Sequence, residues 1–127
     1  MPISVAPDDA QRRVTAIATG MLTLTELTEF FCVQQSGDRQ HWPVLLDATG
    51  ATTVMSADDA ESLADGLKTA IAQTGPHGPV AIIAADHTLF CVVRICQMLC
   101  EKRGVNVRAC RRLQTAERWL VLTLETG

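Results

Sequence analysis

Short apolar runs alternate with helical segments over the last two-thirds of the chain, and this alternation constrains the fold more than any other feature. Residues 44–46 and 79–85 are almost continuously apolar, as is typical of strands buried on both faces. Residues 105–109 supply a third predicted strand. The segments between them place apolar residues three or four positions apart, which is typical of amphipathic helices. Such strands pair in parallel through right-handed crossovers, so this part of the chain predicts βαβαβα units.

The start of the chain predicts a β-hairpin. Residues 3–6 and 13–18 have the apolar patterning of strands, and residues 7–10, Pro-Asp-Asp-Ala, favour a turn between them. Gly20 is expected to break the chain after the hairpin. The predicted fold class is therefore α/β, with a mixed sheet in which an N-terminal antiparallel hairpin precedes the βαβαβα units.

Several helix starts carry capping signals. Thr23 and Glu26 have the spacing of a capping box, and Leu22 and Leu27 occupy the positions of a hydrophobic staple. Asp86 is the expected cap of a later helix. Helices are expected at residues 23–35, 57–73 and 86–103 and from residue 115 onward.

Length and charge limit the possible functions. A chain of 127 residues is the size of one domain, so residues 1–127 are expected to form a single domain. The net charge is −3 and the basic residues are dispersed, whereas nucleic-acid binding needs a concentrated basic face. No segment approaches the roughly 20 apolar residues that span a bilayer. We therefore expect neither nucleic acid nor a membrane as partner.

The N-terminus and the cysteines indicate a cytoplasmic protein. Asp8 and Asp9 stand where a secretory signal would be apolar. Five cysteines are an odd number, and reduced thiols in the cytoplasm are their simplest interpretation.

The order of hairpin, helix and three strand–helix units resembles the STAS fold of anti-sigma-factor antagonists and sulphate-transporter tails. It is most similar to the SpoIIAA-like group of bacterial STAS/SEC14-type proteins, and the resemblance extends from the first hairpin to residues 116–120. The resemblance implies a non-enzymatic regulatory module without a cofactor. Such a module docks to a protein partner, here unidentified, and a homodimer is one expected form.

The resemblance also implies a phosphorylation site. In the STAS pattern a strand ends in Asp, and a loop leads to Asp-Ser-Ser-Gly at the start of the next helix. This places Asp47 at the strand end and the phosphorylated serine on Ser56. The motif is degenerate, because Met55, Ala57 and Asp58 replace the acidic residue, the second serine and the glycine.

Each of these site residues has a plainer interpretation. Ser56 with Asp59 three residues later would form a capping box, and we favour this interpretation over phosphorylation. Asp58 adds negative charge to the same helical turn, where a phosphate would meet repulsion. The Asp47 carboxylate is expected to accept N–H groups of the following turn, although the end of a central strand is also a usual place for a site residue.

Metal and catalytic sites have little support. Cys96 and Cys100 are four residues apart on one predicted helix, but a structural zinc site needs four ligands, usually from paired knuckles. Buried thiols are the favoured interpretation for these two and for Cys91 on the same helix, and for Cys32 and Cys110 as well. A hydrolytic or transfer enzyme would have only Asp47 and His87 to build on, so we expect no enzyme.

Two apolar segments suggest a contact surface. The helix at residues 86–103 has only a narrow polar stripe, at Arg94, Gln97 and Glu101, and residues 119–124 are unusually apolar for a chain end. They either complete the core or meet a second chain. The alternative function is that of a SEC14-type domain, with an apolar pocket between the helices and the sheet that accepts a small lipid-like ligand.

Overall fold

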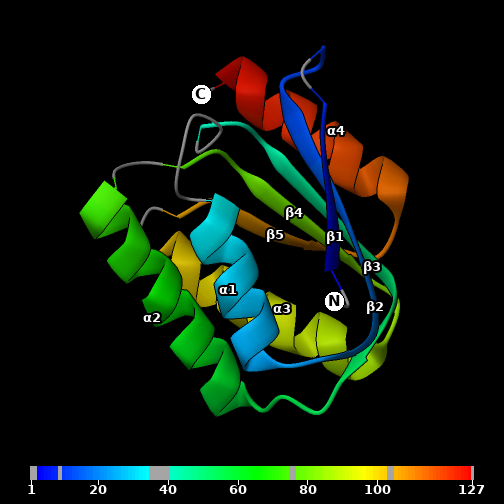
Figure 1. The fold of residues 1–127 in the computed structure, drawn as a ribbon, viewed down its shortest axis with the longest axis vertical. Helices are drawn as coiled ribbons and strands as arrows, with labels where there is room; N and C mark the ends of the chain where they lie inside the picture. Colours follow the sequence, from blue (N-terminus) through cyan, green and yellow to red (C-terminus); the bar gives the residue numbers. More distant parts are fainter. Residues whose placement is uncertain (1–2, 9, 35–40, 75–76, 103–104, 127) are drawn as a thin grey trace.

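A computed structural model describes residues 3–8, 10–34, 41–74, 77–102 and 105–126. Nine elements follow one another in these ranges (Figure 1). They are β1 (Ile3–Asp8), β2 (Arg13–Leu22), α1 (Leu24–Gln34), β3 (Val44–Thr53), α2 (Ala57–Thr74), β4 (Val80–Ala84), α3 (His87–Glu101), β5 (Val107–Cys110) and α4 (Leu113–Thr126). None of the helices in the described ranges is both long and apolar enough to cross a membrane.

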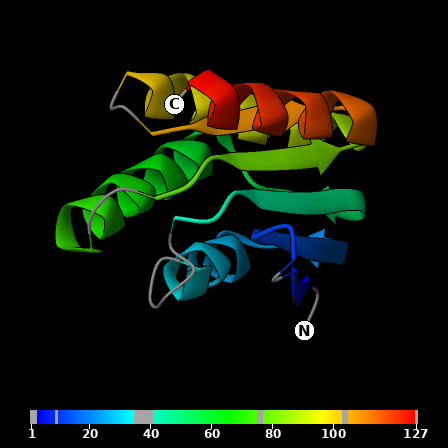
Figure 2. The ribbon, with the colours of Figure 1, turned by 90° about the horizontal axis from the view of Figure 1, so that it is seen from above.

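The five strands form one mixed sheet, as predicted. Their order is β1-β2-β3-β4-β5; β1 pairs with β2 antiparallel, and all other neighbours are parallel. Figure 2 shows the strands stepping across the molecule in this order. In Figure 1, α1, α2 and α3 lie on one side of the sheet and α4 lies on the other.

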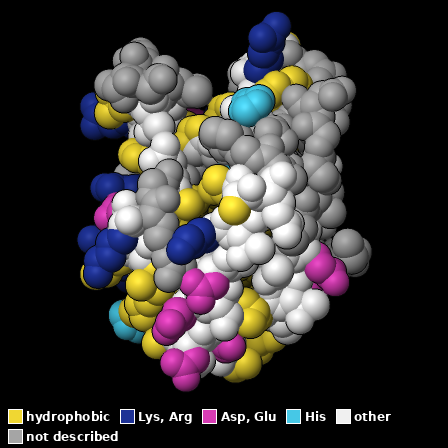
Figure 3. Space-filling view, turned by 90° about the vertical axis from the view of Figure 1, so that its left-hand side faces the viewer, with side chains coloured by type: hydrophobic (Ala, Val, Ile, Leu, Met, Phe, Trp, Pro, Cys, Tyr) yellow, Lys and Arg dark blue, Asp and Glu magenta, His cyan; other side chains and the backbone are white. Residues whose placement is uncertain are grey.

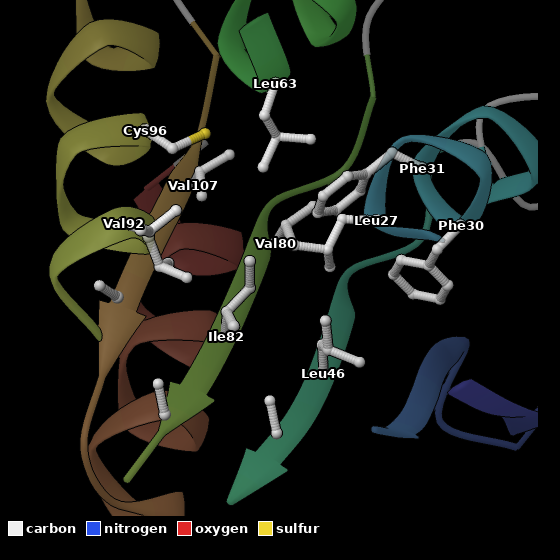
Figure 4. Packing of buried hydrophobic residues seen from close by; sticks show 14 of the residues in the cluster. Leu27, Phe30, Phe31, Leu46, Leu63, Val80, Ile82, Val92, Cys96 and Val107 are labelled. Carbon is white, nitrogen blue, oxygen red and sulfur yellow. The ribbon is translucent and has the colours of Figure 1, made fainter. Parts of the chain in front are cut away.

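Two hydrophobic clusters hold the helices to the sheet. The larger lies on the side of α1, α2 and α3 and includes Leu46 and Ile82 (Figure 4). The smaller joins Leu45 and Ile83 to Leu120 of α4. Successive residues of a strand point to opposite faces, so β3 and β4 contribute to both clusters. This explains why residues 44–46 of β3 and 80–84 of β4 are continuously apolar.

The sheet is covered unevenly, because α4 contacts β3, β4 and β5 and leaves the first hairpin open on its side. Val14, Ala16 and Ala18 of β2 are buried, whereas Ile17 between them is 54% exposed. At the edge of this uncovered area, Arg13 of β2 forms an ion pair with Glu117 of α4, with 3.6 Å between the guanidinium nitrogen and the carboxylate oxygen.

The predicted caps of α1 and α3 are confirmed. The Thr23 hydroxyl accepts the Glu26 N–H at 3.2 Å, and the Glu26 carboxylate accepts the Thr23 N–H at 3.2 Å. Leu22 and Leu27 are both buried beside this capping box. The Asp86 carboxylate accepts the Leu89 N–H at 3.0 Å and caps α3.

The predicted ends of two strands were wrong, because glycine and threonine residues that continue each strand were interpreted as its end. Gly20 does not end the hairpin: its φ is 75°, which glycine adopts without strain, and it pairs with Ala51. β3 likewise continues past residue 46 to Thr53, while its pairing with β4 ends at Ala84. The distal halves of β2 and β3 therefore form a two-stranded ribbon that extends beyond β4.

The C-terminal end of the chain also differs from the prediction. β5 covers Val107–Cys110, two residues later than predicted at its start, and α4 begins at Leu113 rather than at residue 115. The apolar residues 119–124 continue α4. Its buried Leu120 packs in the smaller cluster, and Val121 and Leu122 are exposed.

Gln97 was predicted on the polar stripe of α3 but is 2% exposed. Its side chain accepts the Ala109 N–H at 2.8 Å and donates to Glu101 at 2.9 Å. Ala109 belongs to β5, which lies at the edge of the sheet. Gln97 thus accepts a hydrogen bond from the Ala109 N–H, which has no neighbouring strand to bind.

We predict that Gln97→Leu lowers the free energy of unfolding by about 1–3 kcal/mol, because it leaves the buried Ala109 N–H without an acceptor. Chemical denaturation measures the change. The matched control is Gln73→Leu on the exposed face of α2, which should change stability by no more than about 0.5 kcal/mol. Equal effects of the two substitutions would contradict this role for Gln97.

Candidate functional site

The connection from β3 to α2 is the candidate site. Thr53, the last residue of β3, fixes its start, because its hydroxyl donates to the Leu22 carbonyl oxygen at 2.7 Å and accepts the Met55 N–H at 3.1 Å. Met55 is buried, and Val54 between these two anchored residues is 81% exposed. The connection therefore presents an apolar side chain to solvent from a fixed backbone.

Further apolar surface lies beside Val54 on the β2–β3 ribbon. Leu22 and Thr53 are paired and buried, so the alternation of strands places Met21 and Thr52 on the opposite side. Met21 is 51% exposed. Val54 directly follows Thr53, so its exposed side chain lies at the same end of the ribbon. We call Met21 and Val54 the ribbon face; Ile17, also exposed, lies nearer the centre of the sheet, where it pairs with Asp47.

Ser56 caps α2, as the plainer interpretation of the sequence predicts. The Ser56 N–H donates to the Asp59 carboxylate at 2.9 Å, and the Ser56 hydroxyl accepts the Asp59 N–H at 3.3 Å. This is a reciprocal capping box. Ser56 and Asp58 are both exposed. Phosphorylation of Ser56 stays a prediction.

The first half of α2 is acidic at its surface. Asp58, Glu61 and Asp65 are exposed there. Figure 3 shows acidic side chains gathered at the lower end of the molecule, with hydrophobic side chains close beside them. Negative charge near a helix N-terminus is favourable to the helix, and here it also borders the candidate site.

The prediction that Asp47 lies at a strand end was wrong. Asp47 lies within β3, directly before the last residue of β3 that pairs with β4, Ala48. The β2–β3 register shifts at the same place, between Ile17 and Thr19. The Asp47 carboxylate accepts the Thr49 N–H at 3.1 Å and also the Thr49 hydroxyl. The expected backbone bond therefore forms, but it supports an irregular stretch of strand and not a loop.

The buried thiols behave as structural groups. Cys96 and Cys100 are buried with their sulfur atoms 3.9 Å apart, and the hydrogen bond to Cys100, together with burial, raises the pKa of Cys96. Burial also raises the pKa of Cys110. The side chain of Cys32 lies outside the described residues. Within the described ranges, no group of three or more potential ligands could hold a metal ion.

The start of α3 holds a contact that the sequence interpretation missed. The prediction that Cys91 is buried was wrong, because it is partly exposed. Its sulfur lies 3.6 Å from Nε2 of His87, one helical turn earlier. Next to Cys91, the Phe90 ring packs beneath the guanidinium of Arg111, 4.0 Å from its centroid. The spacing of histidine and cysteine, four residues apart on a predicted helix, was the available signal, because such residues are neighbours on a helix surface.

Comparison with known proteins supports the fold. No family model and no curated protein matches the chain. Among solved structures, it is similar to an uncharacterised protein from the DUF3478 family of Shewanella loihica PV-4, which has a SpoIIAA-like fold. The two share 20% identity over 93% of each chain, with a TM-score of 0.55. The chain therefore has a SpoIIAA-like, STAS-type fold, as the sequence predicted.

We predict that Ser56→Ala lowers the free energy of unfolding by about 1 kcal/mol, because the Asp59 N–H loses its capping oxygen. Ser56→Asp keeps an acceptor at the cap and should remain close to wild type. Ser62→Ala, within the exposed face of α2, is the control and should have little effect. Thermal or denaturant unfolding measures the stabilities of the three variants. A Ser56→Ala protein as stable as its parent would refute the capping contribution.

Proposed function

We propose that this chain is a non-enzymatic regulatory module of the cytoplasm that docks to a protein partner through the β3–α2 connection. The observation that carries the proposal is the exposure of Val54, 81%, between two anchored neighbours. Scattered apolar residues are common on protein surfaces. Val54 differs because the exposed Met21 lies next to Leu22, the residue that pairs with Thr53, at the same end of the ribbon.

A fixed surface of this kind suits docking. An interface gains affinity when its contact residues are already ordered, because less conformational entropy is lost on binding. The Thr53 hydrogen bonds and the Ser56 capping box hold the connection on both sides of Val54. The partner that fits has an apolar pocket for Val54 and a basic rim opposite Asp58 and its acidic neighbours.

The resemblance to anti-sigma-factor antagonists supports the same surface, because it places their switch serine on Ser56. The exposed hydroxyl is accessible to a kinase, and a phosphate would add about −1.5 to −2 charges at neutral pH. In this proposal, phosphorylation changes docking at the neighbouring Val54. The unmodified Ser56 hydroxyl is sufficient to cap α2.

A non-enzymatic role is supported by how the two candidate catalytic residues are engaged. Asp47 is hydrogen-bonded to Thr49 within its own strand, and no hydrogen bond of the described residues links it to His87. General acid–base chemistry needs groups that converge on one substrate position. We therefore propose docking in preference to hydrolysis or group transfer.

The SEC14-type alternative would need an apolar space between α3 and the sheet. The side chains at this place, which include Val92, Cys96, Ile82 and Val107, are buried together in the larger cluster (Figure 4). This packing favours a structural layer there over a lipid pocket. Native mass spectrometry of the protein from its own cell tests the choice, since a co-purifying lipid would favour the alternative.

We predict that a photo-crosslinking residue at position 54 captures a specific protein in the native cell, whereas the same residue at position 121 does not. Val121 is the matched control, because it is an exposed valine, 53% accessible, on α4. With the captured protein purified, Val54→Asp should weaken binding at least about tenfold, as expected for a central apolar contact, and Val121→Asp should leave the affinity unchanged.

Binding that is equally insensitive to both substitutions would overturn the proposed docking surface. Ser56→Asp and Ser56→Ala then test the switch separately. A difference between their affinities supports phosphorylation control, and equal affinities contradict it while leaving docking through Val54 intact.

A further inference from the structure

Cys91 differs from the other described cysteines. Cys96, Cys100 and Cys110 are buried, whereas Cys91 is partly exposed on α3. A thiol reacts through its thiolate and needs access for its partner, so burial makes the other three poor nucleophiles. The raised pKa values of Cys96 and Cys110 act in the same direction.

Cys91 also has a base beside it. Nε2 of His87 lies 3.6 Å from the Cys91 sulfur, and a neutral imidazole with its proton on Nδ1 can accept the thiol proton at Nε2. A nucleophile whose base lies within hydrogen-bonding reach is the usual arrangement for thiol activation. His87 is itself exposed, so proton exchange with solvent can restore it.

Two arginines lie near Cys91, and the Asp86 carboxylate caps the helix directly before His87. Arg94 is exposed three residues after Cys91, and residues three apart are neighbours on a helix surface. The guanidinium of Arg111 lies over the adjacent Phe90 ring. Positive charge near a sulfur stabilises the negative charge that develops on it, and it attracts anionic reagents.

We propose that Cys91 is a site of thiol–disulfide exchange with small carboxylate-bearing disulfides, of which glutathione disulfide is the type. The Cys91 proton moves to Nε2 of His87, and the sulfur attacks one sulfur of the disulfide. A new S–S bond forms as the old one breaks. The released thiolate takes the proton from the imidazolium, so the Cys91 sulfur is oxidised and the leaving sulfur is reduced.

This modification is independent of docking through Val54. The mixed disulfide adds a bulky anionic group to the exposed side of α3, and a reducing thiol removes it by the reverse exchange. Neither step requires a metal, a second cysteine of this chain or an unfolded state.

The test uses the full chain with Cys32→Ser, so that the remaining cysteines are the four described ones. The probe is an aromatic disulfide with two carboxylates, whose released thiolate absorbs visible light. We expect the rapid release of one equivalent of this thiolate per chain. Mass spectrometry should locate the modification at Cys91, and Cys91→Ser should abolish the rapid release. Glutathione disulfide should modify the same residue.

The role of His87 is tested by His87→Gln, with His41→Gln at another exposed histidine as the control. We expect His87→Gln to slow the fast phase about tenfold at neutral pH, a modest effect for a positioned base, and His41→Gln to leave it unchanged. Arg94→Gln should slow the reaction with the dicarboxylate probe more than that with the neutral bis-hydroxyethyl disulfide.

Two results would overturn the proposal. One is modification of Cys91 no faster than that of the buried Cys110 in the folded protein. The other is a His87→Gln protein that reacts at the parent rate while its circular dichroism and unfolding transition match the parent.

Discussion

The parallel pairing of β3 with β4 is the constraint on which the rest of the molecule depends. Leu45 and Ile83 point to α4, while Leu46 and Ile82 point to the other three helices. Each apolar residue buried here contributes about 1.5–3 kcal/mol. A shift of one residue in either strand would exchange the two faces. The double burial therefore fixes the strand register, and the register fixes where α2 and α3 begin.

The uneven covering of the sheet creates the candidate site. α4 covers β3, β4 and β5, and β2 continues with β3 beyond the last paired residue of β4. Apolar side chains of β2 on the surface that α4 leaves uncovered have no helix above them, which accounts for the exposure of Ile17 and Met21. The open ribbon is thus a consequence of strand length, and the docking proposal rests on it.

Features that depend on neighbouring residues could be predicted from the sequence, and features that depend on distant partners could not. The capping box at Thr23 and the cap at Asp86 involve residues three apart, so their patterns are visible in the chain. The length of β3 depends on pairing with β2, and its threonines and Gly50 were therefore interpreted as a loop. The burial of Gln97 depends on the unpaired N–H of Ala109 at the sheet edge. The His87–Cys91 contact was local, and its spacing could have revealed it.

The two helices that follow the paired strands differ in the charge at their starts. α2 has Asp58 and Asp59 in its first turn, whereas α3 has no acidic residue there. Negative charge already occupies the favourable position at α2, so a phosphate on Ser56 would gain little from the helix and would be repelled by these carboxylates. A phosphorylated Ser56 would therefore be stabilised mainly by cations supplied from outside the chain. If the switch operates, phosphorylation should strengthen docking to a basic partner, because the partner relieves the repulsion that the phosphate creates.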